Sequence, residues 1–228
     1  MRLNGFSVPV KRITLFAGHY GSGKTNIAVN YAIKLRQSGK SCKIVDLDIV
    51  NPYFRTKDSA KRLEDAGVET VFPQYANSNV DLPALPKEIY GAVAEKSYHV
   101  VLDIGGDDRG ALALGRYAPD ILKENNYEMI FVANFYRPLT KTANEALEVM
   151  REIESAGGIK FTAIVNNSNL GSETTADIVK LSFNEAKRLA ELSNLPIIST
   201  TVEEKIAKNI EGSFPLELEE KIFQIKGE

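Results

Sequence analysis

The stretch Gly18-His19-Tyr20-Gly21-Ser22-Gly23-Lys24-Thr25 decides the fold that we expect for this chain. It matches the pattern G-x-x-x-x-G-K-[ST], in which a glycine-rich loop wraps around phosphate groups. An apolar, partly β-branched run precedes it at Ile13–Ala17 and predicts a buried strand. After the loop, apolar residues recur at helical spacing as far as Gly39, where a helix would naturally end. A strand, a glycine loop and a helix in this order predict a P-loop.

Each residue type in this loop has a physical reason. Closely spaced glycines let backbone N–H groups turn toward phosphate oxygens, and the dipole of a helix beginning at Lys24 adds positive potential. Lys24 can bridge the β- and γ-phosphates, and the Thr25 hydroxyl can bind Mg²⁺. The nucleotide-binding residues predicted here are Gly18, His19, Tyr20, Gly21, Ser22, Gly23, Lys24, Thr25 and Asn26.

Length and composition predict one α/β domain over residues 1–228. The formal net charge of −2 gives no general attraction to nucleic acid or to an anionic membrane. The single cysteine, Cys42, excludes an internal disulfide and offers no cysteine pair for an iron–sulfur cluster. Residues 1–11 lack the apolar segment of a secretion signal, and no run reaches membrane-spanning length, so we expect a cytoplasmic location.

Strand and helix patterns alternate along the whole chain. Further strands are expected at Cys42–Asp48, Val68–Phe72, Tyr98–Asp103, Met129–Ala133, Phe161–Val165 and Pro196–Ser199. Helices are expected at 56–66, from Pro86, in an Ala- and Leu-rich stretch interrupted at Pro119, at Thr140–Ala156, and after the capping-box patterns Ser182–Glu185 and Thr201–Glu204. The alternation predicts a three-layer α/β/α sandwich with a mostly parallel central sheet, whose ligands bind beyond the C-terminal strand ends.

With these motifs the chain resembles the CobQ/CobB/MinD/ParA group of P-loop ATPases, which share a fold with the nitrogenase iron protein. The resemblance implies a P-loop NTPase of the MinD/ParA/nitrogenase iron protein type. In that family the P-loop reads K-G-G-x-G-K-[ST], and its first lysine reaches the partner's phosphates in a nucleotide-sandwich dimer. His19 stands at that position here. Two interpretations stay open for it, a protonated side chain acting across a dimer and a loop histidine bonded to backbone.

Two acidic segments extend the resemblance. Asp46-x-Asp48 is similar to the family's acidic pair, which implies that Asp48 orients the attacking water or a Mg²⁺-bound water. In Asp103-Ile104-Gly105-Gly106-Asp107, Asp103 fits the Walker B role of holding Mg²⁺ through water, and the Gly106 N–H would approach the γ-phosphate. The spacing is similar to that of the nitrogenase iron protein and implies that Asp107 lies close to the reacting phosphate. The expected metal-binding residues are Thr25, Asp48 and Asp103, and the expected catalytic residues are Lys24 with Asp48, Asp107 or both.

The base is the least specified part of the predicted site. The resemblance implies an adenine-contacting role for Asn166, and the absence of an N-K-x-D motif favours ATP over GTP. The expected function is an ATP-binding protein with slow Mg²⁺-dependent hydrolysis, acting as a switch through homodimerisation or by docking a protein partner. The alternative is an ATP-dependent ligase of the CobB or dethiobiotin synthetase kind. For that ligase Arg55, Lys57, Arg109 or Arg137 could bind a substrate carboxylate.

Two surface segments bear on partners. Asn51–Arg55 carries two aromatic residues beside an arginine and is either a partner surface or an apolar clasp over the sheet edge. In residues 216–223 apolar residues recur at helical spacing, but most of the residues between them are acidic, so we expect no binding to anionic lipid.

Overall fold

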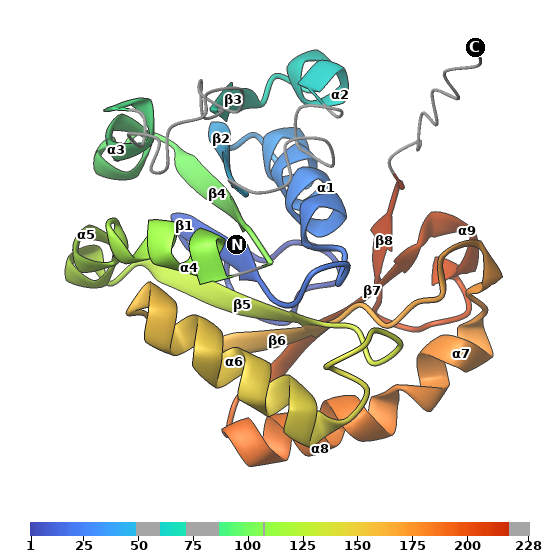
Figure 1. Ribbon diagram of the computed structural model, residues 1–228. Coiled ribbons are helices and arrows are strands. Elements are labelled where there is room, and N and C mark those ends of the chain that lie inside the picture. Colours follow the sequence, from blue (N-terminus) through green and yellow to red (C-terminus); the bar gives the residue numbers. More distant parts are fainter. Residues whose placement is uncertain (49–59, 72–86, 107, 219–228) are drawn as a thin grey trace, which may run out of the picture.

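The computed structural model describes residues 1–48, 60–71, 87–106 and 108–218, and its centre is one parallel sheet (Figure 1). Within these residues the strand order is β3-β2-β4-β1-β5-β6-β7-β8, and each neighbouring pair runs parallel. The strands are β1 Ile13–Ala17, β2 Cys42–Leu47, β3 Glu69–Val71, β4 His99–Ile104, β5 Tyr127–Ala133, β6 Ala163–Asn166, β7 Ile197–Glu203 and β8 Phe214–Leu216. The expected parallel sheet is therefore confirmed.

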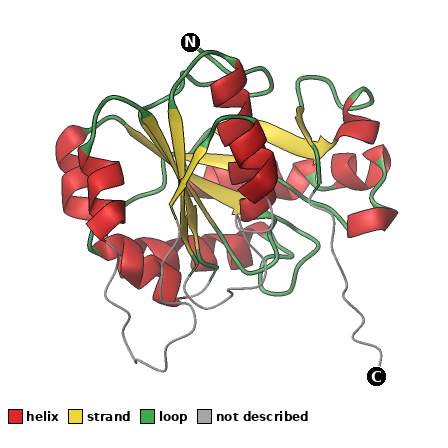
Figure 2. Cartoon of the chain, turned by 90° about the horizontal axis from the view of Figure 1, so that it is seen from above, coloured by secondary structure: helices red, strands yellow, loops and turns green. Residues whose placement is uncertain are grey.

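Helices cover both faces of the sheet, as Figure 2 shows from above. They are α1 Lys24–Gln37, α2 Ala60–Asp65, α3 Lys87–Ala94, α4 Asp108–Gly115, α5 Ala118–Glu124, α6 Ala143–Gly157, α7 Ala176–Leu181, α8 Phe183–Ser193 and α9 Glu204–Ala207, with a 3₁₀ turn at Gly171–Glu173. Among these, no helix is long and apolar enough to cross a membrane.

The two faces of β1 feed two separate cores. Ile13 and Leu15 belong to a buried cluster that α3, α4, α5, α6 and α8 cover, whereas Phe16 belongs to a second cluster under α1 and α2. This alternation is the period-2 pattern of a strand with packed layers on both sides. The three-layer α/β/α sandwich is thus confirmed.

Both predicted capping boxes are wrong. Ser182 has helical backbone angles, and its hydroxyl donates to the Val179 carbonyl and accepts from the Asn166 amide. The Glu185 carboxylate accepts from the backbone N–H of Ala143 in α6. Thr201 lies inside β7. In each case the side chain that was expected to cap a helix forms a hydrogen bond with a residue distant in the sequence.

The other helix and strand boundaries need smaller corrections. The real capping box of α6 is formed by Thr142 and Glu145. Pro119 lies in the first turn of α5 and does not interrupt a helix, because its missing N–H is not needed there. The strand β8 and the helix α7 were not expected. The predicted segment 56–66 is described only from Ala60, where α2 begins.

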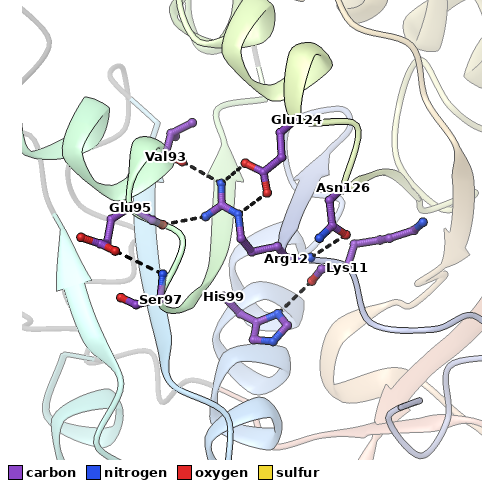
Figure 3. A network of polar contacts seen from close by, with 8 residues as sticks. All are labelled: Lys11, Arg12, Val93, Glu95, Ser97, His99, Glu124 and Asn126. Atoms are coloured by element: carbon purple, nitrogen blue, oxygen red, sulfur yellow. Dashed lines mark hydrogen bonds and ion pairs between the residues drawn. The ribbon is translucent and has the colours of Figure 1, made fainter.

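Arg12 is the centre of a network of polar contacts (Figure 3). It precedes β1 and therefore lies at the end of this strand away from the P-loop. Arg12 is 7% exposed and pairs through its guanidinium with the Glu124 carboxylate at the end of α5. Its remaining N–H groups donate to the carbonyls of Val93 at 2.7 Å and Glu95 at 2.9 Å, at the end of α3. Arg12 therefore ties β1 to the C-terminal ends of two helices.

Candidate functional site

The P-loop connects the C-terminal end of β1 to α1, as expected. Gly23 is the residue before α1 and has φ +91°, a left-handed conformation that favours glycine. A Cβ atom on Gly23 would also lie 2.2 Å from Nδ2 of Asn167. Both the backbone angle and the close neighbour therefore require glycine at this position.

Lys24 lies inside the loop and not on the surface. It is 6% exposed, and its Nζ donates to the carbonyl of His19 at 3.2 Å. The Ser22 N–H donates to the same carbonyl at 3.1 Å. The imidazole Nδ1 of His19 lies 3.0 Å from the carbonyl oxygen of Tyr20, which is the geometry of a loop histidine bonded to backbone. The ammonium group is thus held within the loop at the expected phosphate site.

The acidic residues converge on the start of α1. The Thr25 hydroxyl donates to the Asp103 carboxylate at 2.6 Å. Asp46 is the register partner of Asp103 on the neighbouring strand, and both side chains are buried. The backbone N–H of Asp48 donates to the Asp46 carboxylate at 2.9 Å. Two of the acidic residues predicted for the site, Asp48 and Asp103, therefore lie at neighbouring strand ends together with Asp46.

The turn after β4 presses against the P-loop. A Cβ atom on Gly106 would lie 2.7 Å from the backbone nitrogen of Tyr20 and 2.9 Å from Nζ of Lys24. A Cβ atom on Gly105 would lie 3.2 Å from the Cα of Asp48. One short turn thus touches both the phosphate loop and the acidic end of β2.

Some predicted site residues lie outside the described part of the chain. These are Asp107, Arg55, Lys57 and the rest of Asn51–Arg55, and the side chain of Arg109 is likewise not described. Asn26 lies in the first turn of α1, and its carbonyl accepts from the Asn30 amide at 2.8 Å.

Asn166 does not face the P-loop. Its side chain is fully buried, donates to the Ser182 hydroxyl at 2.9 Å, and accepts from both the N–H and the hydroxyl of Ser168. The amide oxygen therefore accepts two hydrogen bonds and the amide nitrogen donates one inside the protein, and a base contact by Asn166 stays a prediction without geometric support.

Asn167, a residue for which the sequence indicated no role, contacts the P-loop directly. Its Nδ2 donates to the Ser22 carbonyl at 2.7 Å, and its Oδ1 accepts from the Thr201 hydroxyl at 2.7 Å. The side chain thus links β7 to the P-loop. The available signal was a run of polar residues after β6, which does not show which asparagine faces the loop.

Arg137 approaches the P-loop from the segment after β5. Its Nε donates to the Gly21 carbonyl at 3.1 Å. The neighbouring Tyr136 hydroxyl donates to the Ile178 carbonyl in α7 at 2.7 Å. The sequence indicated Arg137 only as a possible ligand for a substrate carboxylate, and the structure places it beside the phosphate loop.

Of three comparisons with known proteins, only the one with solved structures finds similar proteins. Neither a scan against protein-family profiles nor a search of curated sequences finds a match. Among solved structures, the signal recognition particle receptor FtsY from Elizabethkingia anophelis in complex with GDP is similar, with a TM-score of 0.53, 17% identity and coverage of 86% of this chain and 59% of that one. FlhF complexed with GTP and Mg²⁺ has a TM-score of 0.55, 13% identity and coverage of 89% and 70%.

A third similar structure, FtsY from Mycoplasma mycoides, has a TM-score of 0.55 and 19% identity and covers 90% of this chain and 64% of that one. This chain spans 59% and 62% of the two Elizabethkingia FtsY structures. Identities this low carry the fold alone, and the fold is that of a P-loop NTPase. None of these structures is a MinD or ParA protein, so the match does not support the narrower family of the resemblance.

Proposed function

We propose that this protein binds a nucleoside triphosphate with Mg²⁺ at the P-loop, hydrolyses it slowly, and acts as a nucleotide-dependent switch. The observation that carries the proposal is the hydrogen bond from Thr25 to Asp103 beside a buried Lys24. A threonine hydroxyl and a carboxylate are oxygen ligands of the kind that Mg²⁺ prefers, and such sites usually use one or two protein ligands with phosphates.

The predicted phosphate-binding, metal-binding and catalytic residues have separate roles in this proposal. Lys24 neutralises charge on the β- and γ-phosphates, and backbone N–H groups of the loop bind their oxygens. Thr25 and Asp103 would hold Mg²⁺, Thr25 through its hydroxyl and Asp103 through water. Asp48 positions the attacking water or a metal-bound water. Asp107 is the alternative residue for positioning the attacking water. Bound Mg²⁺ would spread the negative charge that develops on the phosphates.

The turn at Gly105 and Gly106 supports the switch part of the proposal. It touches Tyr20 and Lys24 on one side and Asp48 on the other. A γ-phosphate beside Lys24 would enter this contact and reposition the turn. Because α4 begins at Asp108, two residues later, such a shift would reach the helix surface.

The identity of the base is a finer proposal. The sequence lacks N-K-x-D, which favours ATP over GTP. GTP is the second candidate, because the similar structures were solved with GDP and with GTP and Mg²⁺. Competition between ATP and GTP for a fluorescent nucleotide on the same preparation separates the two.

Lys24→Ala is the direct test of nucleotide binding. Because its ammonium is the main charge aimed at the phosphates, we expect at least a hundredfold loss of affinity for the Mg²⁺–nucleotide complex, measured by calorimetry. The melting temperature of the nucleotide-free protein should stay close to that of wild type. Affinity near the wild-type value would refute the P-loop assignment. Turnover that rises sharply with an added carboxylate substrate would favour the ligase alternative.

A further inference from the structure

Arg137 is a second cation on the phosphate loop. Lys24 and Arg137 are the two cationic side chains for which the described part of the chain shows a hydrogen bond to the P-loop. Arg137 lies along Gly21, with Cδ and Nε each 3.7 Å from where a Gly21 Cβ would be. The contact joins residues 116 positions apart, so the fold and not the local sequence creates it.

The backbone around Arg137 is fixed by several constraints. Its N–H donates to the Asn134 carbonyl at 3.2 Å, and its own carbonyl accepts from the Thr140 N–H at 3.3 Å. The Thr140 hydroxyl donates to the Asn134 carbonyl at 2.8 Å. Pro138 restricts the conformation of the residue before it. The backbone of Arg137 is therefore held in place without a ligand.

The turn that holds Arg137 is also strained. Leu139 has φ +63°, a conformation that costs a non-glycine residue about 1–2 kcal/mol. The Leu139 side chain is 64% exposed, so burial of its apolar surface does not offset this cost. Strain that persists without local compensation is typical of segments that position a functional side chain.

The guanidinium keeps most of its hydrogen-bonding capacity. Its Nε is engaged with Gly21, whereas its Nη groups make no hydrogen bond or ion pair within the described residues. Arg137 is half-buried, and its hydrogen bond to Gly21 is exposed, so the guanidinium is accessible to a ligand from solvent. A rigid fork with spare N–H donors suits planar, oxygen-rich or aromatic ligand groups.

The sheet order decides which part of a nucleotide Arg137 meets. The acidic residues come from β2 and β4 on one side of β1, whereas Arg137 and Asn167 follow β5 and β6 on the other side. In the proposed function the metal and γ-phosphate lie at Thr25 and Asp103. The nucleoside end must then extend toward β5 and β6.

Resting on the proposed function, we infer that Arg137 contacts the nucleoside and its α-phosphate, the part shared by di- and triphosphates. Its guanidinium binds an α-phosphate oxygen or stacks on the base, while Nε stays on the Gly21 carbonyl. Contact with the shared part stabilises bound substrate and transition state equally. Arg137 therefore sets affinity and leaves the rate of the chemical step unchanged.

The test uses Arg137→Met, which keeps the aliphatic stem and removes the charge and the donors. We expect at least a tenfold loss of affinity for both the nucleoside triphosphate with Mg²⁺ and the diphosphate, by calorimetry. Single-turnover hydrolysis at saturating nucleotide should stay within twofold of wild type. Arg137→Lys should recover part of the affinity because it restores the charge. Arg151→Met, the same change on an exposed position of α6, is the matched control.

Three results would overturn the inference. Loss of affinity for the triphosphate alone would place Arg137 at the γ-phosphate. Unchanged affinity for both nucleotides would remove it from the site. A lower melting temperature of the nucleotide-free variant, with no recovery in Arg137→Lys, would make it a structural support of the loop. Failure of the wild-type protein to bind any nucleotide would instead refute the proposed function itself.

Discussion

Gly106 is the residue whose substitution separates the switch from nucleotide binding. An added Cβ atom would lie 2.7 Å from a backbone nitrogen of the P-loop, so the turn must move away from it. We expect Gly106→Ala to lower single-turnover hydrolysis at least tenfold, because the turn no longer closes on the γ-phosphate. Affinity for the diphosphate should change less than threefold.

The control for this substitution is Gly91→Ala. Gly91 lies in α3, and an added Cβ there would meet nothing within 4 Å. Alanine is a better helix former than glycine, so this variant should be as active as wild type and more stable by up to about 1 kcal/mol. Equal hydrolysis by the two variants would show that the Gly106 turn does not take part in the reaction.

Asn166 at the end of β6 and Asn167 directly after it show which contacts of single residues the sequence does not predict. The sequence predicts that polar residues follow this strand, and they do. Which one faces the P-loop depends on strand register, because adjacent residues point to opposite sides. The pairing of β6 with β7 shifts at Ile164 and Val165, and no local pattern announces that irregularity. The contact of Asn167 with the P-loop therefore had no specific signal in the sequence, whereas the adenine contact that the resemblance implies for Asn166 stays a prediction.

At the scale of single elements, the P-loop strand and helix were predictable because their evidence is local. The two predicted capping boxes are wrong, because the hydroxyl oxygens of Ser182 and Thr201 form hydrogen bonds elsewhere in the fold. The Ser182 hydroxyl accepts a hydrogen bond from the Asn166 amide, and the Thr201 hydroxyl donates one to the Asn167 amide oxygen. A capping pattern indicates only that a side chain can accept a backbone N–H, and tertiary contacts decide whether it does.

The network of Arg12 and Glu124 gives a pH prediction for the elements it joins. Hydrogen bonding by Arg12 holds the pKa of the Glu124 carboxyl below its usual value, although burial acts in the opposite direction. A carboxyl with a lowered folded-state pKa stabilises the fold above its unfolded pKa of about 4.3. That contribution is lost as the pH falls through the lower folded-state value.

We therefore expect Glu124→Gln to lower the free energy of unfolding at pH 7 by about 3 kcal/mol, since it leaves a buried guanidinium without its charge partner. The difference from wild type should shrink as the pH falls below about 4, in urea titrations from pH 7 to pH 3. Glu203→Gln, in the more exposed pair with Lys205, should cost under about 1 kcal/mol. A pH-independent difference for Glu124→Gln would contradict the ion-pair explanation.

At the scale of the whole molecule, alternating strand and helix patterns predicted the layers but not the strand order. The order places β1 between β4 and β5, so that carboxylates lie on one side of the P-loop and Asn167 with Arg137 on the other. No local pattern contains this arrangement, because it depends on long-range crossovers. The division of the site into a metal side and a nucleoside side is thus a property of the topology.

The oligomeric state of the protein is expected to depend on the bound nucleotide and on its hydrolysis, in which Asp48 is proposed to take part. Tyr20 on the P-loop is 56% exposed and Leu139 on the neighbouring turn is 64% exposed, so the rim of the site presents apolar surface. Gly106 lies against the backbone of Tyr20, so a change at the γ-phosphate would reach this rim. We therefore expect the triphosphate-bound protein to dimerise through the rim and to separate after hydrolysis.

Asp48→Ala should trap that dimer. A carboxylate that orients water contributes to turnover much more than to binding, so affinity should stay within about tenfold, or about 1.4 kcal/mol, while hydrolysis falls at least a hundredfold. Light scattering after gel filtration with Mg²⁺ and nucleotide should then show a stable dimer, and Lys24→Ala should remain monomeric. A normally active Asp48→Ala beside an inactive Asp107→Ala would transfer the water-positioning role to Asp107. An inactive Asp48→Ala that binds nucleotide and stays monomeric would contradict the dimer. This variant does not hydrolyse the nucleotide, so hydrolysis could not have caused a dimer to dissociate.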